Sequence, residues 1–236
     1  AGQTNLGVAA DITSNVLSGF GIEANETGRV ADTLVKAFTS SNTSLESLGE
    51  TMKYVGPVAK AAGFSLEETA AAAGVLGDAG IQGGQAGTTL RSAMLRLIDP
   101  PKQAAEALEQ LGVSILDSKG EMKSFPNIIK ELEKATEGMT DAQKTAIISQ
   151  IAGQQAASGL LAIMDAGGDT LQAFTEELEN AGGTAARIAA EQIDNLAGNI
   201  ELLKSALEYT GIMIYKGFDE PLRIATQTIT GYIVRI

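Results

Sequence analysis

The chain has 236 residues, of which 44% are apolar and 19% are charged, so it carries enough apolar surface for a folded core. Its net charge of −12 repels phosphate, which removes the electrostatic attraction behind most nucleic-acid binding. The chain contains neither Cys nor His. Disulfides and thiolate chemistry are therefore excluded, and the commonest general base and zinc ligand are missing.

The apolar fraction is unusual in kind, because alanine and glycine dominate it, Trp is absent and aromatic residues make up only 4% of the chain. Small side chains let helices approach closely, but each buries little area. We therefore expect packing that is spread over long helix contacts rather than concentrated on a few large residues.

Apolar residues at intervals of three and four, together with capping residues, predict a series of helices up to about residue 181. In chain order the predicted ranges are Asn5–Phe20, a helix capped by Thr27 that carries Val30 to Phe38, Thr43–Ala62, Ser65–Ala79, Gln85–Leu97, Lys102–Leu111, Pro126–Thr136, Thr140–Gly153, Gln155–Ala166 and Thr170–Asn180. The fold class is therefore mainly α.

Local signals fix several of these boundaries. Capping boxes are predicted where Ser or Thr precedes Glu or Gln by three residues: Thr43 with Glu46, Ser65 with Glu68, and Thr140 with Gln143. Gly63 is a natural C-terminal cap. Pro57 lies inside a helical pattern and predicts a kink or break around residues 55–57.

Residues 113–125 depart from the helical period. Val113–Leu116 and Glu121–Phe125 flank the turn Asp117–Gly120, and Gly120 supplies the left-handed position that such turns need. We predict a small β-hairpin here. A helix that continues through the segment is the alternative.

The pattern changes again after Gly182-Gly183. An a/d seam of about four heptads runs over residues 186–214, and a second one follows Pro221. This predicts two domains, a compact helical region of residues 1–181 and a region of long amphipathic, coiled-coil-like helices over residues 182–236. A continuous helix over residues 184–217 would be roughly 50 Å long; the alternative is a helix that folds back on the compact region. We expect the second region to continue in a longer protein.

The glycine-rich stretch Gly74–Gly87 does not match a phosphate-binding loop, because it lacks Gly-Lys-Ser/Thr, G-x-G-x-x-G and a preceding strand. It predicts a tight connection between helices, with Gly80 and Gly84 permitting close approach. Arg91 and Arg96 form either a small basic face or ordinary solvated and ion-paired arginines.

Paired acids do not suggest a reaction centre either. Glu67-Glu68 and Glu176-Glu177 are adjacent, so each pair points to different faces of a helix, and the first-turn position of Glu67-Glu68 favours a helix-dipole role. Asp165 and Asp169 flank two glycines without a calcium-loop pattern. We predict no catalytic, cofactor-binding or metal-binding residues and no enzyme activity.

Residues 30–166 carry a resemblance to a known family. The runs Thr51–Lys60, Gly63–Thr69 and Gly77–Arg91, continued by Leu95–Leu97 and Ser158–Leu161, are similar to the core of phage tail tape measure proteins. The glycines, Pro57 and Arg91 fall in the family's order, and Gly84 stands where a small Ser is usual.

The resemblance implies a long, mainly helical virion protein in the lumen of the phage tail, present in several copies. Its length would set the length of the tail tube and template tube assembly, and it would leave ahead of the DNA at ejection. Implied partners are further copies in a parallel bundle, tail tube and distal tail proteins, and tail assembly chaperones. It would pass through the host cytoplasm during assembly, and the host envelope is a further location after ejection. The acidic surface fits a body beside DNA that does not bind it, although solubility alone also explains that surface.

Two alternatives come from other classes of protein. A membrane-active or pore-forming protein that assists DNA passage would insert residues 212–236, yet Lys216, Asp219, Glu220 and Arg223 interrupt that segment. An enzyme with an all-carboxylate site would need acids that converge in a pocket, and the spacing brings no such pair together.

Overall fold

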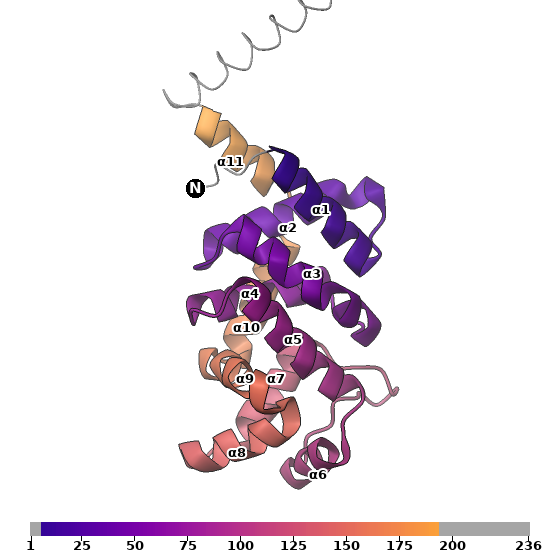
Figure 1. Cartoon of the computed structure of the whole chain (residues 1–236), viewed down its shortest axis with the longest axis vertical. Coiled ribbons are helices and arrows are strands. Elements are labelled where there is room, and N and C mark those ends of the chain that lie inside the picture. Colours follow the sequence, from indigo (N-terminus) through magenta and orange to yellow (C-terminus); the bar gives the residue numbers. More distant parts are fainter. Residues whose placement is uncertain (1–5, 194–236) are drawn as a thin grey trace, which may run out of the picture. The chain divides into compact units, whose positions relative to one another are not determined.

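The structure is a computed structural model that describes residues 6–193. The chain divides into a compact unit, Ala1–Ala185, and a second unit, Ala186–Ile236. Within the described residues all regular elements are helices, as Figure 1 shows. They are α1 (Leu6–Phe20), the short 3-10 helix η1 (Ala24–Glu26), α2 (Thr27–Ser40), α3 (Leu45–Ala62), α4 (Leu66–Asp78), α5 (Gly83–Ile98), α6 (Lys102–Leu111), α7 (Phe125–Ala135), α8 (Asp141–Ala152), α9 (Gln154–Ala166), α10 (Gly168–Glu179) and α11 (Thr184–Ile193).

Helices α1, α3 and α5 lie side by side in one layer of the compact unit (Figure 1). Glycines make these contacts close, because a Cβ on Gly49 of α3 would lie 2.7 Å from Ile12 of α1. A Cβ on Gly87 of α5 would lie 2.8 Å from the Cβ of Tyr54 and 2.9 Å from the carbonyl oxygen of Thr51, both on α3. The layer is thus held at a spacing that ordinary side chains at these positions would not permit.

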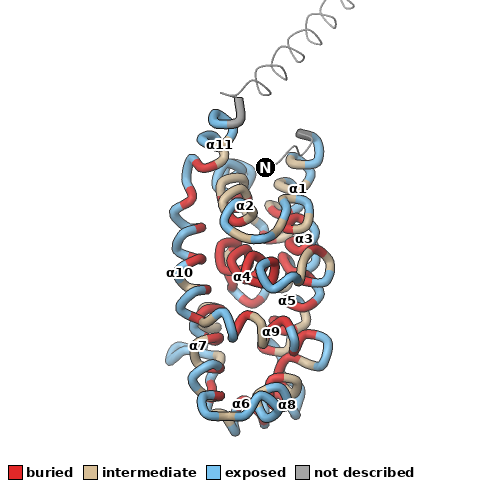
Figure 2. Tube along the Cα trace, turned by 90° about the vertical axis from the view of Figure 1, so that its left-hand side faces the viewer, coloured by how far each residue is buried: buried red, intermediate tan, exposed pale blue. Residues whose placement is uncertain are grey.

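Helix α4 is the centre of the compact unit. Every residue from Leu66 to Gly77 is buried, and the helix packs against α2, α3, α5, α9 and α10 (Figure 2). A helix that is surrounded on all sides needs small residues, and Ala70–Ala73 with Gly74 and Gly77 supply them. Gly74 lies against Phe174 of α10, and Gly77 against Asn42 in the loop before α3.

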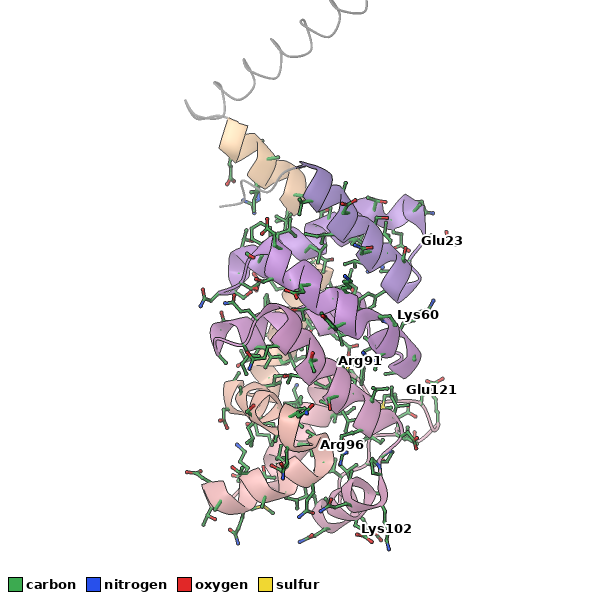
Figure 3. All side chains as sticks on the ribbon, viewed as in Figure 1. Glu23, Lys60, Arg91, Arg96, Lys102 and Glu121 are labelled. Carbon is green, nitrogen blue, oxygen red and sulfur yellow. The ribbon has the colours of Figure 1, made fainter. Side chains whose placement is uncertain are left out.

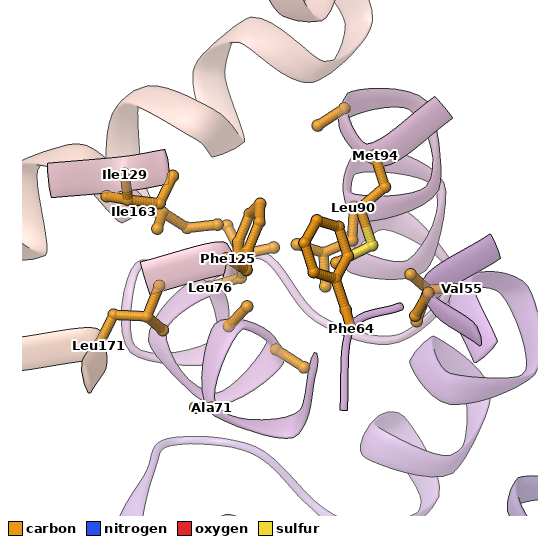
Figure 4. Close-up of a cluster of buried hydrophobic side chains, with 14 of the residues drawn as sticks. Val55, Phe64, Ala71, Leu76, Leu90, Met94, Phe125, Ile129, Ile163 and Leu171 are labelled. Atoms are coloured by element: carbon orange, nitrogen blue, oxygen red, sulfur yellow. The ribbon is translucent and has the colours of Figure 1, made fainter. Parts of the chain in front are cut away.

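Larger side chains close the core next to α4. Phe125, at the start of α7, is fully buried and meets Phe64 edge to face, with ring centroids 5.4 Å apart. Figure 4 shows these two rings between Leu76 of α4 and the α5 residues Leu90 and Met94. Phe125 therefore joins the α4 and α5 helices to the later helices of the unit.

The helical fold class predicted from the sequence is confirmed, but the β-hairpin at residues 113–125 is wrong. In the part of the chain that the structure describes, this segment contains only an isolated bridge between Leu116 and Met122. The predicted turn does form, since Gly120 has φ of +82° and the Asp117 N–H donates to the Glu121 carbonyl oxygen at 2.8 Å. An isolated pair of short strands without a third strand is only marginally stable. The turn is therefore not extended into strands.

Three local predictions also need correction. α3 continues through Pro57 without a break. Its N-terminal cap is Ser44, whose hydroxyl accepts from the Ser47 N–H, and not Thr43. α2 begins at Thr27, with Glu26 in the capping position. In contrast, Gly63 closes α3 in the left-handed conformation, and the predicted capping boxes at the starts of α4 and α8 are both present. Only residues 186–193 of the first predicted seam are described. The rest of that seam and the whole of the second seam lie outside the described residues.

The close approach of α5 to α3 gives a testable contrast between two helical glycines. We expect Gly87→Ala to lower the free energy of unfolding of the chain by about 1–3 kcal/mol, because the new methyl group meets the α3 backbone. Gly28→Ala in α2 meets nothing within 4 Å and should raise that free energy by about 0.5–1 kcal/mol. Urea unfolding followed by circular dichroism measures both; equal effects of the two substitutions would contradict the packing described here.

Candidate functional site

The most unusual chemistry of the compact unit lies at the N-terminus of α4, where two adjacent carboxylates are buried. Glu67 is 5% exposed and Glu68 is 9% exposed. Carboxylates are rarely buried to this extent unless they are paired or hydrogen-bonded. Both lie in the first turn of α4, where the helix dipole favours negative charge.

The two carboxylates face different helices. Glu67 accepts a hydrogen bond from the Arg29 guanidinium of α2, and the Thr33 hydroxyl lies 3.4 Å from the same oxygen. Arg29 also pairs with Glu26 at 2.6 Å. Glu67 therefore fastens α4 to α2, and its partner is a cation that remains partly exposed.

Glu68 joins two helix N-termini. One carboxylate oxygen accepts from the Ser65 N–H at 2.8 Å and completes the capping box of α4. The other accepts from the Phe125 N–H at 3.1 Å, at the first residue of α7. The serine before α7, Ser124, makes no side-chain cap. Glu68 thus supplies from α4 an acceptor that α7 does not provide for itself.

Burial is the largest influence on the Glu68 carboxyl and raises its pKa above the ordinary glutamate value. The backbone N–H groups of Ser65 and Phe125 oppose that shift, while the charge of Glu179 on α10 adds to it. Proton uptake by this carboxyl is therefore coupled to the junction of α4 and α7.

Side chains from distant helices cap several other helix ends in the same manner. Glu133 of α7 accepts from the Gly168 N–H at the start of α10 at 3.0 Å. Asp32 of α2 accepts from the N–H groups of Gly183 and Ala185, both at 2.8 Å. Helices without a local cap are thereby stabilised by tertiary contacts, because a helix end leaves backbone groups that need partners.

Arg96 is a donor that caps a helix C-terminus, whereas the acids above are acceptors at helix N-termini. Its guanidinium donates to the carbonyl oxygens of Gln150 and Ile151 at 2.8 Å each, where α8 ends. Arg91, one of its neighbours on α5, is exposed. Arg91 and Arg96 therefore do not act together as one basic group, and the role of Arg96 follows from the tertiary fold alone.

The remaining acids singled out in the sequence lie apart in the structure. Glu177 pairs with Lys36 of α2 at 2.5 Å, whereas the neighbouring Glu176 accepts from Gln172. Asp165 pairs with Lys144 at 2.7 Å, and Asp169 pairs with Lys130 at 2.8 Å. Glu177, Asp165 and Asp169 thus each serve a separate contact, whereas Glu176 bonds within its own helix.

The glycines of residues 74–87 act in packing, as the sequence predicts, but not all in the expected way. Gly84 does lie close to α3, with Glu50 3.0 Å from the position of a Cβ. Gly80 has open space around it and is required for its φ of +82° instead. Gly87 brings α5 against the α3 backbone, with the Thr51 carbonyl oxygen 2.9 Å from the position of a Cβ, and its spacing in the sequence did not indicate this contact.

No group of three or more acids in the described residues could hold a metal ion. None of the described helices is, by itself, long and apolar enough to cross a membrane; only α8 and α9 taken together pass a test of length and composition, and they are bent by 120° at the break between them. The interpretation of the chain as non-catalytic stays a prediction.

Comparison with models of known protein families assigns this helical chain to a family. The model of the phage-related minor tail protein family matches residues 1–153, so the chain belongs to that family of phage tail proteins. The family supports a structural role and a location in the virion tail.

Individual relatives are more specific. The chain is 38% identical to the "Tape measure protein" of Pneumococcus phage Dp-1 over 98% of its own length and 20% of the relative's. It is 31% identical to the "Probable tape measure protein" of Escherichia phage P2 over 96% of its own length and 28% of the relative's. A third relative, the "Probable tape measure protein" of Clostridium phage phiCD119, is 26% identical over 97% of this chain. The chain thus spans between 20% and 28% of the length of these relatives, and no solved structure matches it.

The double capping role of Glu68 predicts an unequal effect of two similar substitutions. Glu68→Ala leaves the N–H groups of Ser65 and Phe125 without their acceptor in a buried place, and we expect a loss of about 1–3 kcal/mol in the free energy of unfolding. The matched control is Gln143→Ala, which removes the same capping-box position from the exposed start of α8 and should cost about 0.5–1 kcal/mol. Urea titrations of both variants decide this; an equal loss would mean that the bond to α7 contributes nothing.

The raised pKa of Glu68 also predicts a pH dependence. Because the folded state holds this proton more tightly than the unfolded state, the contribution of Glu68 to stability is complete below its unfolded pKa and declines as pH rises through its folded pKa. We expect the stability difference between the native chain and Glu68→Ala to shrink as pH increases between about pH 4 and pH 8. Paired urea titrations across that range test it, and a difference that grows with pH would show that the backbone bonds outweigh burial.

Proposed function

We propose that this chain is a segment of a phage tape measure protein, which sets the length of the tail tube, templates its assembly and leaves the tail ahead of the DNA. The observation that carries the proposal is the likeness of almost the whole chain to proteins named as tape measures in phages of three different hosts. The amphipathic helices predicted for residues 182–236 fit it, because the length of an extended helix is proportional to residue number at ~1.5 Å per residue.

The compact unit and the amphipathic region would serve this function differently. A folded body of this size is roughly 30–40 Å across, whereas the same number of residues in one helix would extend to more than ~250 Å. Length along the tail would therefore come mainly from the extended helical segments, including the predicted region 182–236. The compact unit would act as a body at one position on the ruler.

The proposed partners follow from this location. Further copies of the chain would associate in a parallel bundle through the predicted seam, and tail tube proteins, distal tail proteins and tail assembly chaperones would contact the protein during assembly. The net charge of −12 supports a protein that lies near the DNA path without binding the genome. No observation on the described residues favours the membrane-active alternative.

Changes of length in the predicted seam test the ruler function. Removing two heptads within residues 186–214 of the full-length gene deletes 14 residues and preserves the a/d phase, so tails should shorten by roughly 20 Å. Duplicating the same two heptads should lengthen them by the same amount. Electron microscopy of purified tails gives the mean length. The control exchanges exposed residues of the same heptads without changing their number, and it should leave the tail length unaltered. If neither length variant changes the tail length, the proposed ruler function is wrong.

A further inference from the structure

Two independent features coincide on the outer face of α3 and α5. The first is apolar: Tyr54 on α3 is 42% exposed, and Leu95 and Ile98 on α5 are 44% and 36% exposed. Among the described residues the only other large apolar side chains exposed to this extent are Val8 and Leu116. Most large apolar side chains of the unit are buried, so this group is an exposed apolar strip.

The second feature is a set of cations without carboxylate partners. Seven lysines and arginines among the described residues pair with acids. Lys53, Lys60 and Arg91 belong to the described cations that form no such pair, and all three are exposed. Figure 3 shows Lys60 and Arg91 on adjacent helices of this face.

The contacts between α3 and α5 bring the two features together. Gly83 lies beside Glu50, and Gly87 lies beside Tyr54, so the helices run in parallel with a constant offset in sequence. Continuing that offset by one turn puts Arg91 next to Val58, and by two turns it puts Leu95 next to Ala62, the last residue of α3. We call Lys53, Tyr54, Lys60, Arg91, Leu95 and Ile98 the α3–α5 face.

The acids near this face are already engaged or lie at its ends. The Glu50 carboxylate lies against Gly83 and Gly84, at the N-terminus of α5, where the helix dipole holds it. Glu46 lies a turn before Glu50, and Asp99 follows the last residue of α5. Lys60 extends over the end of α1, with its ammonium group against Gly21. Arg91 therefore lies between the levels of Tyr54 and Leu95, and Lys60 lies at the edge toward α1, so cations alternate with exposed apolar side chains on this face.

We propose that the α3–α5 face binds an acidic amphipathic helix of another protein. A pair of parallel helices offers a groove for a third helix, the strip of Tyr54, Leu95 and Ile98 matches apolar residues at a three- and four-residue spacing, and the cations match flanking carboxylates. Three cations on a chain of net charge −12 are too few for nucleic acid or an anionic membrane. In the described residues no helix of a second copy presents an acidic face around an exposed apolar strip. The inference rests on these side chains and does not require the ruler function.

Site-specific photocrosslinking in phage-producing cells tests the proposal in the full-length protein. A photoreactive phenylalanine analogue is placed at Tyr54 or Leu95, and at Leu116 as an equally exposed apolar control. We expect Tyr54 and Leu95 to crosslink to the same acidic helical segment of one other protein, mapped by peptide mass spectrometry, and Leu116 not to reach it. Crosslinks to a second copy of this chain or to lipid, or the absence of any crosslink from both positions, would overturn the proposal.

A matched pair of charge reversals separates specific recognition from general repulsion. Lys53→Glu with Arg91→Glu should reduce the crosslink from Leu95 by roughly tenfold, the effect of losing two exposed ion pairs. Lys119→Glu with Lys134→Glu reverses two other cations without carboxylate partners and changes the net charge equally, but should leave the yield unaltered. Circular dichroism establishes that both double variants remain folded. The proposal is wrong if both double variants reduce the crosslink yield equally, or if Lys53→Glu with Arg91→Glu does not reduce it.

Discussion

The fold depends on the complete burial of α4, a helix of small residues with two carboxylates at its first turn. Small side chains allow neighbouring helices to approach α4 closely on all sides, and Ala70–Ala73 and Gly74 supply them. Such a helix buries little apolar area for each residue, so its position must be fixed by other interactions. Glu67 and Glu68 provide them, one toward α2 and the other toward α7.

This arrangement has a consequence for how the unit holds together. Desolvation offsets much of the attraction of buried charged groups, so Glu67 and Glu68 are weak evidence for net stability. The capping contacts of Glu68, Glu133, Asp32 and Arg96 each join helices that are far apart in sequence. They define which helix ends meet, while the small-residue contacts determine how closely the helices approach. A protein of a phage tail can thus place a central helix of small residues by contacts that are specific to particular helix ends.

The same interior explains why the outer surface matters for function. The carboxylates of Glu67 and Glu68 are buried and hydrogen-bonded inside the unit, so they are not available to partners. What remains on the α3–α5 face is a small number of free cations beside exposed apolar residues. Recognition by such a face comes from its pattern and not from net charge, which is strongly negative for the whole chain.

The sequence by itself determined the helices and most of their ends, because caps, prolines and apolar spacing act over a few residues. Ser65 with Glu68 and Thr140 with Gln143 form the boxes that their spacing indicates, and the family could be identified from the runs between residues 51 and 91. Only the tertiary structure decided that Glu68 also caps α7, that Arg96 closes α8 and that Gly87 meets the backbone of α3, since these partners are 33 to 57 residues apart. It also decided against the hairpin: the turn at Asp117–Gly120 is local, but strands need a neighbour, and the fold provides none for residues 113–125.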